Sequence, residues 1–162
     1  MVAPEAQDML ETYACFAHFQ DQYLLAGPGS YWYGKWFVVS PPTRGYKIHV
    51  TTAYAHAETV AQTALSVLRT MRIPHKVVRD GERLREQLAT RQAGKFITIY
   101  TTGPQQRDQV VRELDPKMGR IGLPLGPVPT TPDAAGRLSP EERLGGSSYL
   151  FGRAYDERAT DD

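Results

Sequence analysis

The segment YKIHV, residues 46–50, decides how the rest of the sequence is interpreted. Four of its five residues are typical of a β-strand. Lys47 and His49 lie two positions apart, so on a strand both side chains leave from the same face. Ile48 and Val50 alternate with them and are typical of a core. We therefore expect a short strand with a basic face and an apolar face.

The flanking sequence predicts a protein of mixed strands and helices. Pro/Gly-rich turns and apolar periodicity separate the expected elements. We expect helices at 5–25, 56–72, 80–92 and 104–118, strands at 31–40, 46–53, 74–78, 94–102 and 147–155, and a loop or partly mobile lid at 119–148. This order predicts an α+β fold, with a mixed or antiparallel sheet and helices packed on it. One domain is expected at 1–155, followed by a flexible acidic tail at 156–162.

Composition excludes several classes of function. The chain has 162 residues, 41% of them hydrophobic and 23% charged, which is ordinary for one globular domain. A net charge of +1 gives no general electrostatic reason to bind nucleic acid or a membrane. Cys15 is the single cysteine, which rules out an internal disulfide and a multi-cysteine zinc site. The N-terminus lacks the pattern of a signal peptide and no long apolar run is present, so we expect a cytoplasmic protein.

Further basic residues lie on the neighbouring expected strands. Lys76 is in the middle of PHKVV (74–78), Lys95 begins the strand at 94–102, and Arg91 precedes Lys95 by four residues. Each lysine alone is typical of a solvated strand edge, and His49 alone of an ordinary structural histidine. Together they alternate with core-type residues, which predicts a cluster of cations on one sheet face and a pocket for an anion such as phosphate.

Other site motifs are weak. The glycine-rich stretches lack the spacing of a nucleotide-binding loop, and no GxSxG sequence supports a serine hydrolase. The four histidines, at 18, 49, 56 and 75, have neither HxH nor HExxH spacing, so we expect no metal site.

Several of these segments occur in the order of a known family. WFVVSPP (36–42), GYKIHV (45–50), HAETV (56–60), PHKVV (74–78) and GKFITIY (94–100) resemble the N-terminal lyase domain of class III and IV lanthipeptide synthetases. The resemblance covers residues 31–115. The expected fold and pocket are also similar to those of the phosphothreonine lyases that some bacterial pathogens secrete.

The resemblance implies β-elimination of phosphate from phosphoserine or phosphothreonine in a ribosomal precursor peptide. The product is dehydroalanine or dehydrobutyrine. Lys76 matches the catalytic base, and His49 the general acid that protonates the leaving phosphate. Lys47, Arg91 and Lys95 match phosphate-holding positions. No metal or organic cofactor is implied, and Lys76 would be kept partly neutral by nearby cations and partial burial.

The C-terminal part departs from the family pattern. The resemblance implies a phosphate-binding arginine there, for which Arg137, Arg143 and Arg153 are the candidates, Arg137 and Arg153 being those that we assign. His75 stands where the family usually has phenylalanine.

The related synthetases also continue into kinase and cyclase domains. For this chain we therefore expect separate kinase and cyclase partners, with the aromatic stretch YWYGKWF (31–37) either contacting them or packing under the first helix. The alternative functions are a non-catalytic peptide-binding subunit and a different phosphate-binding protein.

Overall fold

Strand β3 (Arg44–Val50), which contains YKIHV, lies inside a seven-stranded sheet. The computed structural model describes residues 24–25, 32–35, 42–78 and 80–157. Within them the strand order is β1-β2-β4-β5-β3-β9-β8, and every neighbouring pair is antiparallel. The other strands of this sheet are β1 (Leu24–Leu25), β2 (Trp32–Lys35), β4 (His75–Val78), β5 (Ile97–Thr101), β8 (Glu142–Leu144) and β9 (Leu150–Asp156).

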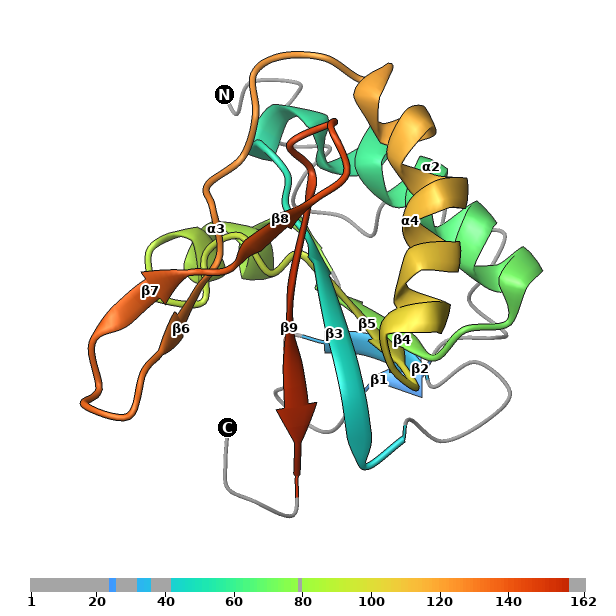
Figure 1. Cartoon of the computed structure of the whole chain (residues 1–162). Helices are drawn as coiled ribbons and strands as arrows, with labels where there is room; N and C mark the ends of the chain where they lie inside the picture. The colour runs from blue at the N-terminus through green and yellow to red at the C-terminus, as the bar shows by residue number, and fades with distance from the viewer. Residues whose placement is uncertain (1–23, 26–31, 36–41, 79, 158–162) are drawn as a thin grey trace.

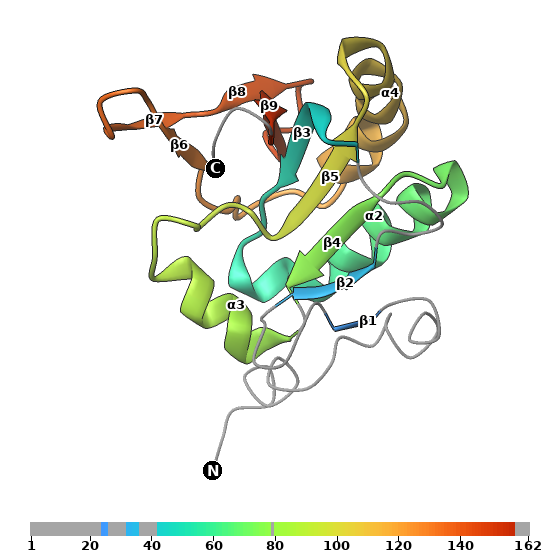
Figure 2. The ribbon, with the colours of Figure 1, turned by 90° about the horizontal axis from the view of Figure 1, so that it is seen from below.

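Two helices cover one face of the sheet, and a small hairpin lies on the other side. The helices are α2 (Ala57–Met71) and α4 (Pro104–Gly119), and the hairpin pairs β6 (Thr130–Pro132) with β7 (Leu138–Pro140) (Figures 1 and 2). Among the described residues, the remaining helices are the short 3₁₀ helix η3 (Tyr54–His56) and α3 (Gly81–Leu88), which contact each other. The two sides of the sheet therefore have different neighbours.

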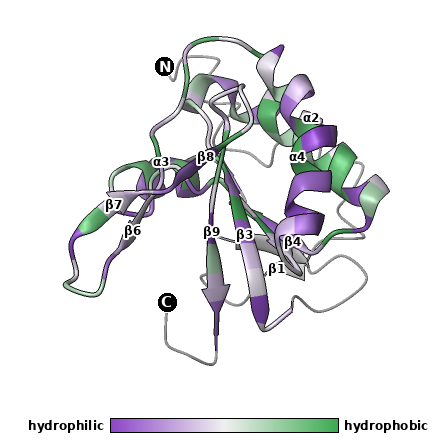
Figure 3. Ribbon diagram, viewed as in Figure 1, coloured by the Kyte–Doolittle hydropathy of each residue, from purple (hydrophilic) through white to green (hydrophobic). Residues whose placement is uncertain are grey.

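Side-chain periodicity explains why α2 and α4 pack on the same face. Their buried residues recur every three or four positions, which places them on one side of each helix (Figure 3). Facing them, alternate strand residues form the sheet side of the core, and these are Ile48, Val50, Val77, Ile97 and Ile99. The positions between them project to the opposite face, where the hairpin lies.

The expected α+β class, with an antiparallel sheet and packed helices, is confirmed. Several boundaries differ from expectation, and three of the differences change which segments are strands. Leu24–Leu25 form β1 against β2 instead of ending a helix, and the rest of that expected helix lies outside the described residues. Residues 119–148 contain three strands, because the loop pairs with itself and with β9. Strand β9 runs through Asp156, which pairs with Arg44.

Two further expectations concern the aromatic stretch at 31–37 and the possibility of a membrane-spanning helix. The stretch 31–37 has described backbone only at 32–35, so its expected role as a contact surface lies outside the described residues. In the described parts of the chain, no helix is both long and apolar enough to cross a membrane.

His75 is buried on the core face of β4. Its Nδ1 lies 2.7 Å from the carbonyl oxygen of Ile73, to which it donates. Burial lowers the pKa of His75 to about 4 from 6.5, and the charge of Arg69 acts in the same direction. The folded protein therefore holds this ring in its neutral form.

This burial predicts a specific loss of stability in acid. Between pH 6.5 and about 4 the unfolded chain binds a proton at residue 75 that the folded chain does not, so stability falls as pH falls. The shift corresponds to about 3 kcal/mol at the lower end. Urea unfolding of His75→Phe at pH 7, 5.5 and 4.5 should show a smaller pH dependence than wild type. If the free energy of unfolding depended equally on pH in both proteins, His75 would not be the buried neutral group that we infer, whatever the stabilities at pH 7.

Candidate functional site

Two rows of side chains cross the face of the sheet that points away from α2 and α4. In the first row, Thr98 of β5 pairs with Lys76 of β4 on one side and with His49 of β3 on the other. In the second row, two residues along, Lys47 of β3 pairs with Tyr100 and with Arg153 of β9. Directly paired residues point to the same face, so strand register alone gathers four basic groups.

A pocket of about 830 Å³ lies over these rows. The sheet forms its floor, the turn after α3 forms one side, and the β6–β7 hairpin forms another. The lining residues are Lys47, His49, Lys76, Arg91, Gln92, Lys95, Thr98, Tyr100, Thr130, Thr131, Pro132, Asp133, Ala134, Leu138 and Arg153. The expected cations at 47, 49, 76, 91 and 95 therefore lie around one hollow.

Of the C-terminal arginines, Arg153 lines this pocket and Arg137 does not. Arg137 belongs instead to the turn of the hairpin. Its backbone N–H donates to Asp133 Oδ1 at 2.9 Å, and its guanidinium, 82% exposed, lies 3.5 Å from Asp133 Oδ2. Arg143 is exposed and donates to Ser148. Strand pairing with Lys47 is what turns Arg153 toward the pocket.

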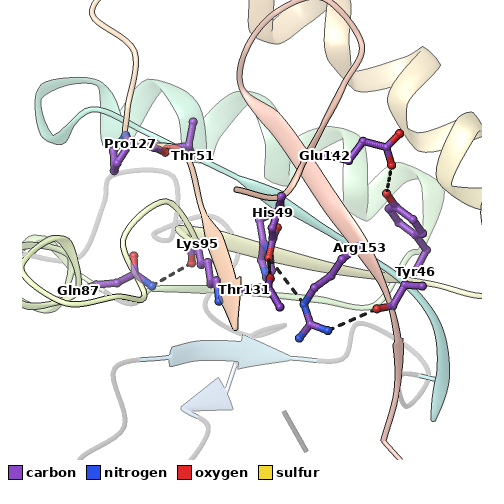
Figure 4. Close-up of polar contacts among 11 residues, drawn as sticks. Tyr46, His49, Thr51, Gln87, Lys95, Pro127, Thr131, Glu142 and Arg153 are labelled. Atoms are coloured by element: carbon purple, nitrogen blue, oxygen red, sulfur yellow. Dashed lines mark hydrogen bonds and ion pairs between the residues drawn. The ribbon is translucent and has the colours of Figure 1, made fainter. Parts of the chain in front are cut away.

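Glu141 is the site residue that the sequence did not reveal. It lies between the hairpin and β8, and its side chain is buried. Its Oε1 is 2.7 Å from His49 Nδ1, and its Oε2 accepts from the Thr131 hydroxyl at 2.6 Å and lies 3.7 Å from Arg153 Nε. Figure 4 shows His49, Thr131 and Arg153 converging from different strands. No motif in its surroundings (SPEER, 139–143) marked it.

Electrostatics make Glu141 an ionised acceptor. Burial raises the pKa of its carboxyl, but the hydrogen bond and charge of His49, the Thr131 hydroxyl and Lys95 outweigh this and hold the pKa below its ordinary value. Burial lowers the pKa of His49, and Lys95 and Lys47 add to this against the opposing effect of Glu141. An ionised carboxylate only accepts, so His49 Nδ1 carries the proton and Nε2 is the other ring nitrogen.

Lys47 is held by aromatic rings. Its Nζ lies 5.1 Å from the ring centre of Tyr155 and 5.6 Å from that of Tyr100, and the two rings meet edge to face at 5.8 Å. Electron-rich ring faces stabilise an ammonium group at such distances. The rings therefore offset part of the repulsion between Lys47 and the other cations of the pocket.

Close backbone packing places the hairpin and the Lys95 turn. Gly94 has φ +91°, and a Cβ there would meet the backbone of Pro129 at 2.7 Å. At Gly126 a Cβ would meet Thr52 at 2.4 Å. Thr51 donates to the Pro127 carbonyl at 2.6 Å, and Gln87 donates to the Lys95 carbonyl at 3.0 Å. These contacts fix the segment that leads from α4 into β6.

The arrangement suits a tetrahedral dianion. Five lysine and arginine side chains and His49 surround the pocket, whereas the carboxylates at or beneath its lining are Asp133 and Glu141. Arginine and lysine together hold phosphate oxygens through charge-assisted hydrogen bonds. Among the described residues, no group of three or more His, Cys, Asp or Glu side chains is arranged to hold a metal ion.

Fold and pocket together define an α+β protein with a basic pocket on the open face of its sheet. Residues 29–124 match the family described as RamC, N-terminal domain, which is more than half of the chain. The chain therefore belongs to this family. RamC is a lanthipeptide-related protein, so membership connects the chain with the biosynthesis of modified, ribosomally made peptides. No curated protein matches the sequence.

The residues that match the family model include only part of the pocket lining. Lys47, His49, Lys76, Arg91 and Lys95 lie inside the matched range. The hairpin, Glu141 and Arg153 lie beyond residue 124 and are joined to the other half by strand pairing and hydrogen bonds.

The His49–Glu141 contact predicts the position of the imidazole proton. In ¹⁵N NMR spectra, neutral His49 should carry its proton on Nδ1 because Glu141 accepts there. Glu141→Gln keeps a carbonyl oxygen as acceptor and should keep this tautomer. Glu141→Leu removes the acceptor, so the proton of neutral His49 should no longer be confined to Nδ1. His56 is a suitable internal reference, since its Nδ1 has no hydrogen-bond partner within the described structure. An unchanged His49 tautomer in Glu141→Leu would contradict the role of this carboxylate.

The ring contacts of Lys47 predict a matched pair of variants. Tyr155→Leu removes one ring face. In a double-mutant cycle with Lys47→Met, this change should show a coupling of ~0.5–1 kcal/mol in the free energy of unfolding, the size of a cation–π contact. Tyr155→Phe keeps the ring and loses only the hydrogen bond to the Pro42 carbonyl, so its coupling to Lys47 should be near zero. Urea unfolding measures both. Equal coupling for leucine and phenylalanine would assign the effect to the hydroxyl.

Proposed function

We propose that this protein is a carbon–oxygen lyase that removes phosphate from phosphoserine or phosphothreonine in a ribosomal precursor peptide. The observation that carries the proposal is the row Lys76–Thr98–His49. It places one amine and one imidazole on the two strands that flank β5, on either side of a threonine and within a ring of cations. Membership in a lanthipeptide-related family supports a peptide as the substrate.

The reaction needs a base and an acid on two sides of one side chain. The amine of Lys76, once deprotonated, takes the proton from Cα, and the electron pair forms the Cα–Cβ double bond. The Cβ–O bond breaks, and His49 delivers a proton from Nε2 to the leaving phosphate. The products are inorganic phosphate and a dehydroalanine or dehydrobutyrine residue. General acid–base catalysis of this kind contributes typically about 10²- to 10⁴-fold.

Lys76 and His49 are separated by a distance that suits this division of roles. They lie on β4 and β3, with β5 between them, and adjacent strands are about 4.8 Å apart. A gap of two strand spacings, roughly 10 Å at the backbone, gives room for one phosphorylated side chain over Thr98. The side chains of Lys76 and His49 can then reach the substrate from opposite sides.

Lys47, Lys95, Arg91 and Arg153 are assigned to the phosphate. Lys95 is 9% exposed and Arg91 is exposed at the rim, so the first would hold the phosphate at depth and the second would attract it. Their charges offset the negative charge that builds up on the leaving group. The reaction requires no metal or organic cofactor.

His49 must be an imidazolium when the phosphate leaves. Burial lowers its pKa in the empty pocket. A phosphate dianion beside Nε2 favours the charged form, and Glu141 at Nδ1 does the same. Substrate binding would thereby supply the proton that the elimination uses.

The chemistry also defines the partners. The substrate must first be phosphorylated by a Ser/Thr kinase, and dehydro residues are electrophiles that a cyclase can consume. We therefore propose a phosphorylated precursor peptide as the immediate ligand, with a kinase and a cyclase acting before and after it.

Mass analysis of one reaction tests the proposal. Incubation with a phosphothreonine peptide should give inorganic phosphate and a peptide lighter than the hydrolysis product by one water. Lys76→Ala should slow turnover by about 10²-fold or more while leaving phosphopeptide binding largely intact, and His49→Ala should also slow turnover strongly, because the phosphate then leaves unprotonated. Lys47→Ala, Arg91→Ala and Lys95→Ala should raise KM more than they lower kcat.

Lys117→Ala is the matched control, because this exposed lysine lies on α4 and outside the pocket lining. It should keep wild-type turnover. Phosphopeptide binding without any dehydro product would instead favour a non-catalytic peptide-binding subunit. Release of phosphate with an unmodified hydroxyl would show hydrolysis and reject the lyase assignment.

A further inference from the structure

The pocket is larger than one phosphorylated side chain requires. Its volume of about 830 Å³ lies high in the range of ~300–1,000 Å³ typical of small-molecule sites. The basic groups lie on the sheet floor and the α3 side. On the hairpin side the lining is different in character, and this side has no role in the chemistry proposed above.

The hairpin wall carries a small apolar patch that faces the pocket. Pro132 of β6 and Leu138 of β7 are direct cross-strand partners, so their side chains lie next to each other on one face of the hairpin. Both line the pocket, together with Ala134 of the turn. Leu138 is 48% exposed. Thr131, between Thr130 and Pro132 on β6, also borders the pocket and donates to Glu141.

We propose that Pro132, Ala134 and Leu138 form an apolar subsite for the peptide residue next to the phosphorylated one. This inference rests on the proposed function, since it requires a phosphopeptide in the pocket. The preferred substrate is then a phosphoserine or phosphothreonine with an apolar neighbour, and Leu138 is the specificity-determining residue. A phosphate held on the sheet floor leaves the adjacent residue against the hairpin wall, because the same hollow is bounded by both.

The position of the patch in the pocket indicates that it contacts a substrate side chain and is not merely one of several exposed apolar residues on the surface. The other large exposed apolar residues of the described structure, Leu123, Leu125 and Val128, lie on the segment before β6 and do not line the pocket. Leu138 lines the same pocket as the basic residues of the floor. Covering its exposed half would remove apolar surface from water in the bound state only.

Binding of two peptides tests the subsite independently of turnover. Both contain a phosphonate analogue of phosphothreonine, whose C–P bond cannot be eliminated, flanked on each side by leucine in one peptide and by asparagine in the other. Wild type should bind the leucine peptide roughly tenfold more tightly, as expected for half the transfer free energy of a leucine side chain. In Leu138→Ser the preference should fall below about twofold, with inorganic phosphate bound as in wild type.

Val128→Ser is the matched control, because Val128 is also 48% exposed and lies outside the pocket lining. It should retain the full preference. Equal binding of both peptides by wild type, or an unchanged preference in Leu138→Ser, would overturn the subsite. These outcomes are independent of whether phosphopeptides are eliminated, so a failed subsite and a failed lyase assignment remain distinguishable. Circular dichroism checks that each variant is folded.

Discussion

The buried contact between His49 and Glu141 joins the two halves of the pocket. His49 belongs to the central strand β3, and Glu141 follows the hairpin that walls the pocket. The contact compensates a buried carboxylate, fixes the imidazole and ties the hairpin to the sheet. Removing one partner of such a pair leaves an uncompensated polar group in a dry environment, which is why the position of the hairpin depends on it.

A pocket lined with like charges is unfavourable when it is empty, and the structure offsets this in three ways. Glu141 compensates His49 and approaches Arg153. The faces of Tyr100 and Tyr155 surround the ammonium group of Lys47. Arg91 remains at the solvated rim, where water screens its charge. A dianion would complement this cluster of positive charge, so the charge distribution that costs stability is also the one that favours an anion in the pocket.

Backbone packing around Gly94 and Gly126 connects this electrostatic arrangement to the fold. Both glycines admit a backbone approach that a side chain would block, and the segment between α4 and β6 passes through that space. The hairpin reaches the open face of the sheet because of this route. Its inner face then adds an apolar surface to a basic floor, and the pocket has one part suited to a phosphate and another suited to an apolar side chain.

The sequence by itself determined the local part of this protein. Alternation along YKIHV put Lys47 and His49 on one face, and helical periodicity at 56–72 predicted α2 within a residue at each end. Lys76 could be placed because it alternates with apolar residues of β4, and a period of two leaves no choice of face. Lys95 and Arg91 lie between α3 and β5, where alternation does not fix the face, and the tertiary structure brings both to the pocket lining. Only tertiary structure distinguished Arg153 from Arg137. Strand pairing with Lys47 directs Arg153 toward the pocket, whereas Arg137 stays in the hairpin turn beside Asp133. Glu141 was also decided there, because its partner lies 92 residues away and nothing in its neighbourhood records that contact.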